Sequence, residues 1–298
     1  MSVSTSQPVR ATFRDYLQLT RLNKPIGLLL LLWPTWWALL LAAQGLPQPK
    51  IALIFTAGVV LMRSAGCAIN DYFDRDIDGA VERTANRPIA QGRIPPSHAL
   101  WVAAVLSLIS LLLVLQLNRL TIQLAIIAAA LAATYPLFKR FTYLPQAYLG
   151  VAFGWGIPMA FAAVQGTVPA IAWLLLLANI FWTVAYDTQY AMVDRADDLT
   201  IGVRSTAILF GQDDCRAVAI LQVSALVTLL LVGLHPDSGL NGLFYLFLTG
   251  AAGLSIYFQR LIKDRDRQRC LQAFLRNNWW GALIFAGIFL DLLGGPQP

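Results

Sequence analysis

Nine apolar segments divide this chain, and each is about as long as a helix that crosses a lipid bilayer, which takes roughly 20 residues. They span residues 26–43, 51–69, 99–117, 120–138, 146–164, 170–186, 217–234, 240–258 and 279–293. Hydrophobic residues make up 57% of the sequence and charged residues only 13%, whereas a soluble domain is usually about a quarter charged. We therefore expect an all-α, polytopic membrane protein with nine transmembrane helices. Residues 1–298 form one domain in this interpretation, with a polar segment at 1–24.

Basic residues are divided unevenly between the two sides that nine alternating helices define. The side with the N-terminus carries 20 of the 22 Lys and Arg residues, and only Lys50 and Arg119 fall on the other. Cytoplasmic loops carry an excess of Lys and Arg, so this pattern predicts a cytoplasmic N-terminus. It also explains the basic charge without a nucleic-acid partner, and no obligate protein partner is evident.

Acidic residues gather at two places where an apolar segment ends. The first acidic run consists of Asn70, Asp71, Asp74 and Asp78. The second acidic run consists of Asp187, Asp194, Asp197 and Asp198. Carboxylates beside hydrocarbon are costly, so acids at such positions indicate a functional site.

Helical geometry groups these acids further, if each helix continues through its acidic run. Side chains three, four and seven residues apart then share one face. The first face carries Arg63, Asn70, Asp71, Asp74 and Asp78, and it excludes Asp76. The second carries Asp187, Tyr190, Asp194 and Asp198, with Asp197 at its margin. Two aligned faces favour a binding site over the alternative, a solvated acidic helix end capped by basic loops.

The chemistry of such a site is that of Mg²⁺ and phosphate. Mg²⁺ prefers oxygen ligands and is typically held by one or two carboxylates together with substrate phosphates. Two facing acidic clusters are suited to hold Mg²⁺ ions against a diphosphate. Arg63, Lys139 and Arg140 lie on the same side and are predicted to contact phosphate oxygens.

Both acidic runs match a known pattern. Residues 70–78 fit the N-D-x-x-D-x-x-x-D motif of the UbiA superfamily of intramembrane aromatic prenyltransferases, and residues 187–198 resemble its second motif, D-x-x-Y-A-x-x-D-x-x-x-D. The flanks at 62–67, 83–88 and 201–206 are similar to the bacterial branch that acts on 4-hydroxybenzoate. The resemblance covers essentially the whole chain.

The resemblance implies a fold, a reaction and a location. The nine helices would surround a central cavity whose cytoplasmic end is capped by two loops, in the bacterial inner membrane. A polyprenyl group would pass from polyprenyl diphosphate to the ring carbon ortho to the hydroxyl of 4-hydroxybenzoate, an early step of ubiquinone synthesis. Mg²⁺ is the implied cofactor, and the two substrates and membrane lipid are the implied partners.

Residue roles follow from the motif positions. The implied catalytic residues are Asn70, Asp71, Asp74, Asp78, Asp187, Asp194 and Asp198. The metal ligands among them are Asn70, Asp74, Asp78, Asp194 and Asp198. The substrate-binding residues are Arg63, Tyr135, Lys139, Arg140, Tyr190, Arg21 and Asn23. Arg21 and Asn23 are assigned to the acceptor carboxylate, and Arg63 to the diphosphate.

Two alternatives stay open from the sequence. A prenyltransferase for another aromatic acceptor, such as dihydroxynaphthoate or homogentisate, would keep the same acids. A divalent-cation transporter would also need acids within the membrane. It would place them near the middle of a path open to both sides, whereas these acids lie at one end.

Overall fold

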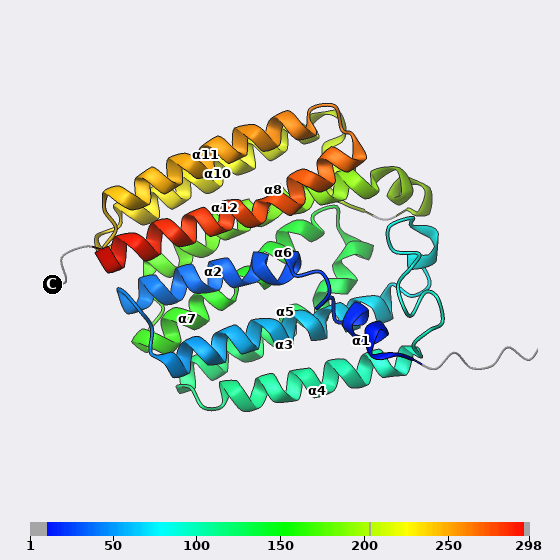
Figure 1. Ribbon diagram of the computed structural model, residues 1–298, viewed down its shortest axis with the longest axis horizontal. Coiled ribbons are helices and arrows are strands. Elements are labelled where there is room, and N and C mark those ends of the chain that lie inside the picture. Colours follow the sequence, from blue (N-terminus) through cyan, green and yellow to red (C-terminus); the bar gives the residue numbers. More distant parts are fainter. Residues whose placement is uncertain (1–10, 203, 295–298) are drawn as a thin grey trace, which may run out of the picture.

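A computed structural model describes residues 11–202 and 204–294, and these residues form an all-helical bundle (Figure 1). The α-helices are α1 (Phe13–Leu19), α2 (Ile26–Ala43), α3 (Pro49–Phe73), α4 (Pro96–Val114), α5 (Arg119–Phe141), α6 (Pro145–Gly154), α7 (Gly156–Gln165), α8 (Ala170–Ile201), α9 (Thr206–Phe210), α10 (Asp214–Leu234), α11 (Gly242–Ile262) and α12 (Arg267–Gly294). Three 3₁₀ turns join them: η1 (Asp78–Ala80), η2 (Gly211–Asp213) and η3 (Pro236–Ser238).

Each of the nine apolar segments coincides with a helix or with a pair of short helices. The predicted boundary near residues 117–120 is confirmed, because Asn118 ends the connector and its side chain caps α5 by accepting a hydrogen bond from the Thr121 N–H at 2.9 Å. The segment at 146–164 is broken into α6 and α7 at Trp155. Pro158 has no N–H to donate to the Gly154 carbonyl, which explains the interruption.

The prediction of a helical membrane protein is confirmed. Seven helical spans in the described part of the chain are long and apolar enough to cross a bilayer. Within α5 the described apolar stretch is Arg119–Tyr135, and α12 carries Arg267, Arg269 and Arg276 in its first half. The protein is therefore a multi-pass membrane protein, while the count of nine crossings stays a prediction.

The connectors divide between the two ends of the bundle (Figure 1). The short connectors at residues 44–48, 115–118, 166–169 and 235–241 lie at one end, near the last turn of α12. The long connector from α3 to α4 and the segment from α8 to α10 lie at the other end, beside α1. Both acidic runs are therefore at the same end of the molecule.

Helix α8 is held in the centre of the bundle by tryptophans from three helices. Trp182 of α8 packs between Trp37 of α2 and Trp280 of α12, with ring centroids 5.3 and 4.9 Å away. All three side chains are fully buried. Trp182 Nε1 donates to Asn277 Oδ1 at 3.0 Å, and Trp37 Nε1 donates to the Gly281 carbonyl at 3.1 Å. Such packing and interhelical hydrogen bonds join helices in lipid, where apolar burial alone gives little preference for helix contact over lipid contact. This cluster fixes the helix that carries the second acidic run.

Candidate active site

A large cavity opens inside the bundle at the end that holds both acidic runs. Its volume is about 1660 Å³, well above the range of roughly 300–1,000 Å³ typical of small-molecule pockets. It follows α3 from Ile54 to Asp71, a distance of about 25 Å at 1.5 Å per residue. Small side chains on α5 line one wall: Ala125, Ala128, Ala129, Ala132 and Ala133. The space suits a long apolar ligand with a polar head.

The charges that line the cavity are mainly positive and lie at one end. Among the described residues, the charged lining consists of Arg21, Lys24, Arg63, Arg83, Arg87, Asp71 and Asp187. The cations outnumber the acids, so an anionic head group is favoured at this end. Asn23, Asn70, Tyr135 and Tyr190 add polar groups to the same lining. The structure thus brings together most of the side chains that the sequence assigned to the substrates.

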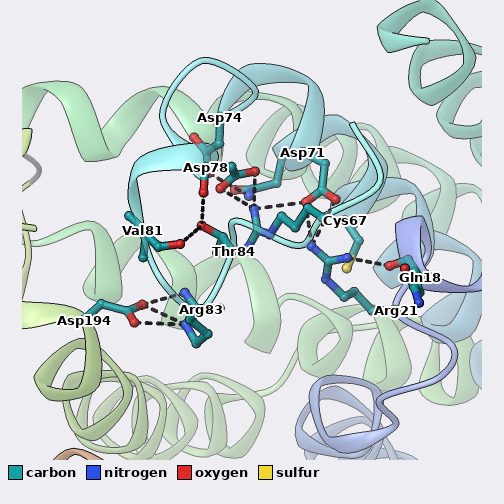
Figure 2. A network of polar contacts seen from close by, with 12 residues as sticks. Gln18, Arg21, Cys67, Asp71, Asp74, Asp78, Val81, Arg83, Thr84 and Asp194 are labelled. Atoms are coloured by element: carbon teal, nitrogen blue, oxygen red, sulfur yellow. Dashed lines mark hydrogen bonds and ion pairs between the residues drawn. The ribbon is translucent and has the colours of Figure 1, made fainter. Parts of the chain in front are cut away.

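The first acidic run leaves its helix, which corrects the helical arrangement expected from spacing. Helix α3 ends at Phe73, Asp74 is its C-cap, and Asp78 begins η1. Asp71 and Asp78 nevertheless meet at one guanidinium: Arg87 Nη1 lies 3.1 Å from Asp71 Oδ1 and 2.7 Å from Asp78 Oδ2 (Figure 2). The long loop between α3 and α4 folds back over the helix end and supplies this arginine. Asp71 and Asp78 are therefore brought together by the loop and not by the periodicity of a continuous helix.

Two further contacts complete the first run. Arg21 Nη2, from the connector between α1 and α2, donates to Asp71 Oδ1 at 2.7 Å (Figure 2). Asn70 Nδ2 donates to Asp74 Oδ2 at 2.8 Å. The contact with Asp71 gives Arg21 a partner at the acidic end of the cavity that its sequence position did not predict.

The second acidic run stays on one helix. Helix α8 continues to Ile201 and ends at Gly202, whose φ of 73° is the left-handed conformation that glycine adopts without strain. Asp194 receives a bidentate contact from Arg83, with Nε at 2.9 Å and Nη2 at 2.5 Å from Oδ2 (Figure 2). The Arg83 guanidinium also lies 4.5 Å from the centre of the Tyr190 ring. Loop arginines of the first connector therefore reach both acidic runs.

Burial and charge act against each other at these contacts. Burial raises the pKa of the Asp78 carboxyl above its ordinary value, and the neighbouring Arg87 only partly offsets this effect. Burial alone would lower the pKa of Arg83, but Tyr190 and Asp194 raise it above its ordinary value. Arg83 and Arg87 stay charged, and the buried Asp78 carboxylate is stabilised by the neighbouring Arg87 cation.

One residue that sequence reasoning missed joins the loop after the first acidic run to the second run. Arg267, at the start of α12, donates to Glu82 of the first loop at 2.8 Å and to Asp197 of α8 at 2.6 Å. Nothing in the local sequence around Arg267 indicated this bridge, because it depends on contacts between distant segments. Arg83 and Arg87 carried a signal, since two arginines four residues apart stand in a polar loop.

The remaining predicted residues divide into described and undescribed ones. Arg63, Tyr135, Asn23 and Asp187 line the cavity. Asp198 lies on the last turns of α8, partly exposed. The predicted phosphate contacts Lys139 and Arg140 lie outside the described side chains.

The acids fit a divalent metal by chemistry, although arginines contact them in this arrangement. Among residues 11–202 and 204–294, no three His, Cys, Asp or Glu side chains converge on a single point. Asp78 and Asp194 are absent from the described cavity lining, whereas their partners Arg87 and Arg83 belong to it. The arginines occupy the cationic positions between carboxylates and cavity. A metal held by oxygen ligands would take those positions once the arginines turn towards an anion.

Comparison with known proteins identifies the class of this fold and site. The UbiA prenyltransferase family matches residues 31–282. The chain is 54% identical to a 4-hydroxybenzoate octaprenyltransferase of Alkalilimnicola ehrlichii, covering 98% of this chain and 99% of that protein. It is 57% identical to a 4-hydroxybenzoate octaprenyltransferase of Nitrosomonas europaea, covering 95% and 97%. The chain belongs to the UbiA prenyltransferase family.

Solved structures agree with this assignment. An apo UbiA homologue from Aeropyrum pernix K1 superposes with a TM-score of 0.77 at 27% identity, covering 89% of this chain and 98% of that one. A homologue from Archaeoglobus fulgidus, whose structure holds GPP and Mg²⁺, has a TM-score of 0.70 at 17% identity, covering 94% and 99%. At that identity the second comparison establishes the fold.

Proposed function

We propose that this chain transfers a polyprenyl group from polyprenyl diphosphate to the ring carbon ortho to the hydroxyl of 4-hydroxybenzoate, an early step of ubiquinone synthesis. The observation that carries the proposal is a cavity with a cationic head and a long apolar body, placed between the two acidic runs. The relatives named as 4-hydroxybenzoate octaprenyltransferases support the choice of acceptor. The whole chain acts as one catalytic unit in this proposal.

Mg²⁺ is the proposed metal, held by Asn70, Asp74, Asp78, Asp194 and Asp198. When bound, it would supply positive charge that neutralises the departing diphosphate. The fit rests on the oxygen donors of these side chains and on the arginines that already contact Asp78 and Asp194. Asp71 and Asp187 support this set, on the turns of α3 and α8 that face the cavity.

The protein's own cations would bind the diphosphate. Arg83 and Arg87 line the cavity and reach it from a loop, so turning from carboxylate to phosphate requires only side-chain rotation. Arginine suits this task because its planar guanidinium can donate two hydrogen bonds to one anion. Lys139 and Arg140 are proposed as further phosphate contacts from their position in the sequence.

The bond changes follow from a donor held in this way. The bond between the allylic carbon and the diphosphate oxygen breaks, and its electron pair leaves with the diphosphate. The electron-rich ring of the acceptor then forms the new carbon–carbon bond and loses a proton to restore aromaticity. Tyr135 and Tyr190 line the cavity close to this reaction, where aromatic faces favour a cation. The apolar walls keep water from the cation.

Arg63, Arg21 and Asn23 are the proposed contacts of the remaining substrate oxygens. Arg63 is assigned to the diphosphate, and Arg21 with Asn23 to the acceptor carboxylate. Because Arg21 also contacts Asp71, we expect its loss to affect both substrates.

The decisive experiment uses purified protein with Mg²⁺, labelled 4-hydroxybenzoate and a series of prenyl diphosphates. Prenylated 4-hydroxybenzoate is expected, and its yield across the series gives the preferred chain length. Dihydroxynaphthoate and homogentisate in place of 4-hydroxybenzoate test the other acceptors. Product with one of these alone would replace the proposed acceptor. Divalent-ion uptake into proteoliposomes without prenyl transfer would favour the transporter instead.

Orientation in the bacterial inner membrane is proposed from the charge pattern, with the acidic end facing the cytoplasm. Single cysteines at Ser97 and Asp237, in a chain lacking its three native cysteines, test it. Ser97 is exposed near the acidic end, and the Asp237 side chain is 69% exposed at the opposite end. An impermeant thiol reagent added outside intact spheroplasts should label only the second. Labelling of the first alone would reverse the orientation.

A further inference from the structure

Arg63 of α3 is partly buried and lines the cavity. It stands ten residues before the end of α3, about 15 Å along the helix from Phe73. Its Nη1 donates to the Cys67 Sγ one turn later, and its guanidinium carbon lies 5.9 Å from the centre of the Phe153 ring. Its Nε is buried without a hydrogen-bond partner. Arg63 forms no ion pair with an acid in the described part of the chain, so its guanidinium is available to an anion.

Gly27 of α2 creates the space that this guanidinium occupies. A β-carbon at position 27 would lie 2.5 Å from Arg63 Nη2, 2.9 Å from Nε and 3.1 Å from Cζ. Distances under about 3 Å between such atoms do not occur without displacement. The guanidinium therefore fills the volume that any other residue at 27 would need.

The backbone gives no other reason for a glycine here. Gly27 is the second residue of α2, a right-handed helix, and it is not among the glycines with positive φ. Glycine is a poor helix former compared with alanine, so it weakens the helix unless the missing side chain serves a purpose. Gly27 and Arg63 both line the cavity, which places that purpose at the substrate site.

We propose that Gly27 is a positioning residue, whose missing side chain seats the Arg63 guanidinium so that its unpartnered edge is presented to a substrate oxyanion. The inference rests on the proposed function. In the proposed function this oxyanion is a diphosphate oxygen of the donor. The carboxylate of the acceptor offers the same chemistry to a guanidinium, and the binding test below distinguishes the two. Gly27 itself touches neither substrate in this proposal and acts through Arg63.

Gly27→Ala tests the proposal without threatening the fold. The atoms in the way belong to the end of a flexible side chain, which can move, and alanine favours the helix. We expect a melting temperature equal to or above that of the wild type, with kcat/KM lowered about tenfold, since a charge-assisted contact is weakened but not removed. A purely structural role would instead lower the melting temperature. An unchanged kcat/KM would overturn the proposal.

The pairing with Arg63 is tested by a double-mutant cycle. In an Arg63→Ala background, Gly27→Ala should cost less than about twofold, because the side chain it displaces is gone. Equal losses in both backgrounds would show that Gly27 does not act through Arg63. Gly58→Ala is the matched control: Gly58 lies on α3 within the membrane, and nothing is within 4 Å of its added β-carbon. A tenfold loss in that control as well would assign the effect to crowding of the cavity.

Binding measurements identify the oxyanion and separate this proposal from the proposed reaction. Calorimetric titrations of wild type and Gly27→Ala would use inorganic pyrophosphate in one arm and 4-hydroxybenzoate in the other. Weaker binding of one probe names the oxyanion that Arg63 meets, whereas unchanged binding of both contradicts the role of Gly27. If the wild type binds pyrophosphate but prenylates no acceptor, the proposed function fails while the pairing of Gly27 with Arg63 is still measured.

Discussion

The two acidic runs carry carboxylates at the same spacing on different backbones. Asp194 and Asp198 are four residues apart on the continuous helix α8, so they lie one turn apart on one face. Asp74 and Asp78 have the same separation, but the chain between them leaves α3 and enters η1. The irregular backbone turns the chain back, and the returning loop brings Arg87 to its own run and Arg83 to the other. The second acidic run is thus held on one continuous helix, whereas the first acidic run leads into the loop that covers both runs.

The largest expected effect tests whether both runs are needed. Asp74→Ala and Asp194→Ala should each lower prenyl transfer by at least about a hundredfold, because each removes charge that balances the metal beside a departing diphosphate. Excess chelator should have the same effect on the wild type. Activity is measured in membranes after confirming equal insertion.

Asp76→Asn is the control for these substitutions. Asp76 lies between the same helix end and η1, but its side chain is 78% exposed, and its ion-pair partner in the described part of the chain is Arg75. It should retain most activity. Near-normal turnover in Asp74→Ala or Asp194→Ala would show that one acidic run is sufficient for activity and would contradict the need for both.

The next effect concerns the arginine that links the two runs. Arg83→Ala frees Asp194 from its bidentate partner. We expect the donor KM to rise about ten- to hundredfold, the range for one lost charge-assisted contact. The Mg²⁺ concentration for half-maximal rate should fall, because the carboxylate no longer has a competing cation. A donor KM that stays constant while the Mg²⁺ requirement rises would mean that Arg83 orders the metal site and does not contact diphosphate.

Sequence patterns predicted the positions of the helices well but predicted the contacts between distant segments poorly. Helix-length apolar segments identified α2 to α8 and α10 to α12, because a bilayer imposes one length and one composition, whereas the short helix α9 was not predicted. The end of α3 was predicted wrongly: acids spaced by three and four fit a helix equally well whether or not the helix continues past Phe73. The pairing of Arg83 with Asp194 joins residues 111 positions apart, and no local pattern specifies such a contact. The Gly27–Arg63 contact was missed for the same reason.

A smaller effect tests the helical nature of the second run. Ala196→Gly lies inside α8 on its exposed side and should destabilise the last turns by about 1 kcal/mol. If the helix holds Asp194 and Asp198 in place, the loss of kcat/KM is at most about fivefold, the limit reached when the last turns are only marginally folded. Asp76→Gly is the matched substitution in the first run, where the chain is already a turn and glycine is tolerated. Equal losses at the two positions would show that the rigidity of α8 contributes nothing.

The smallest effect concerns the bridge that Arg267 makes between the loop after α3 and the second acidic run. Arg267 pairs with Glu82 and Asp197, but the Arg267 and Glu82 side chains are 38% and 79% exposed, so solvent screens the bridge. Exposed ion pairs contribute about 0.2–1 kcal/mol, and Arg267→Ala should therefore lower kcat/KM by about 1.4- to fivefold, more at low ionic strength than at high. Arg269→Ala is the control, since Arg269 lies on the same helix end and pairs only with the exposed Asp264.

The sharper measurement combines Arg267→Ala with Glu82→Gln and, separately, with Asp197→Asn. Non-additive losses in both pairs would show that Arg267 couples the covering loop to α8. Full additivity with Glu82→Gln would mean that the loop is held over the acids by Arg83 and Arg87 alone.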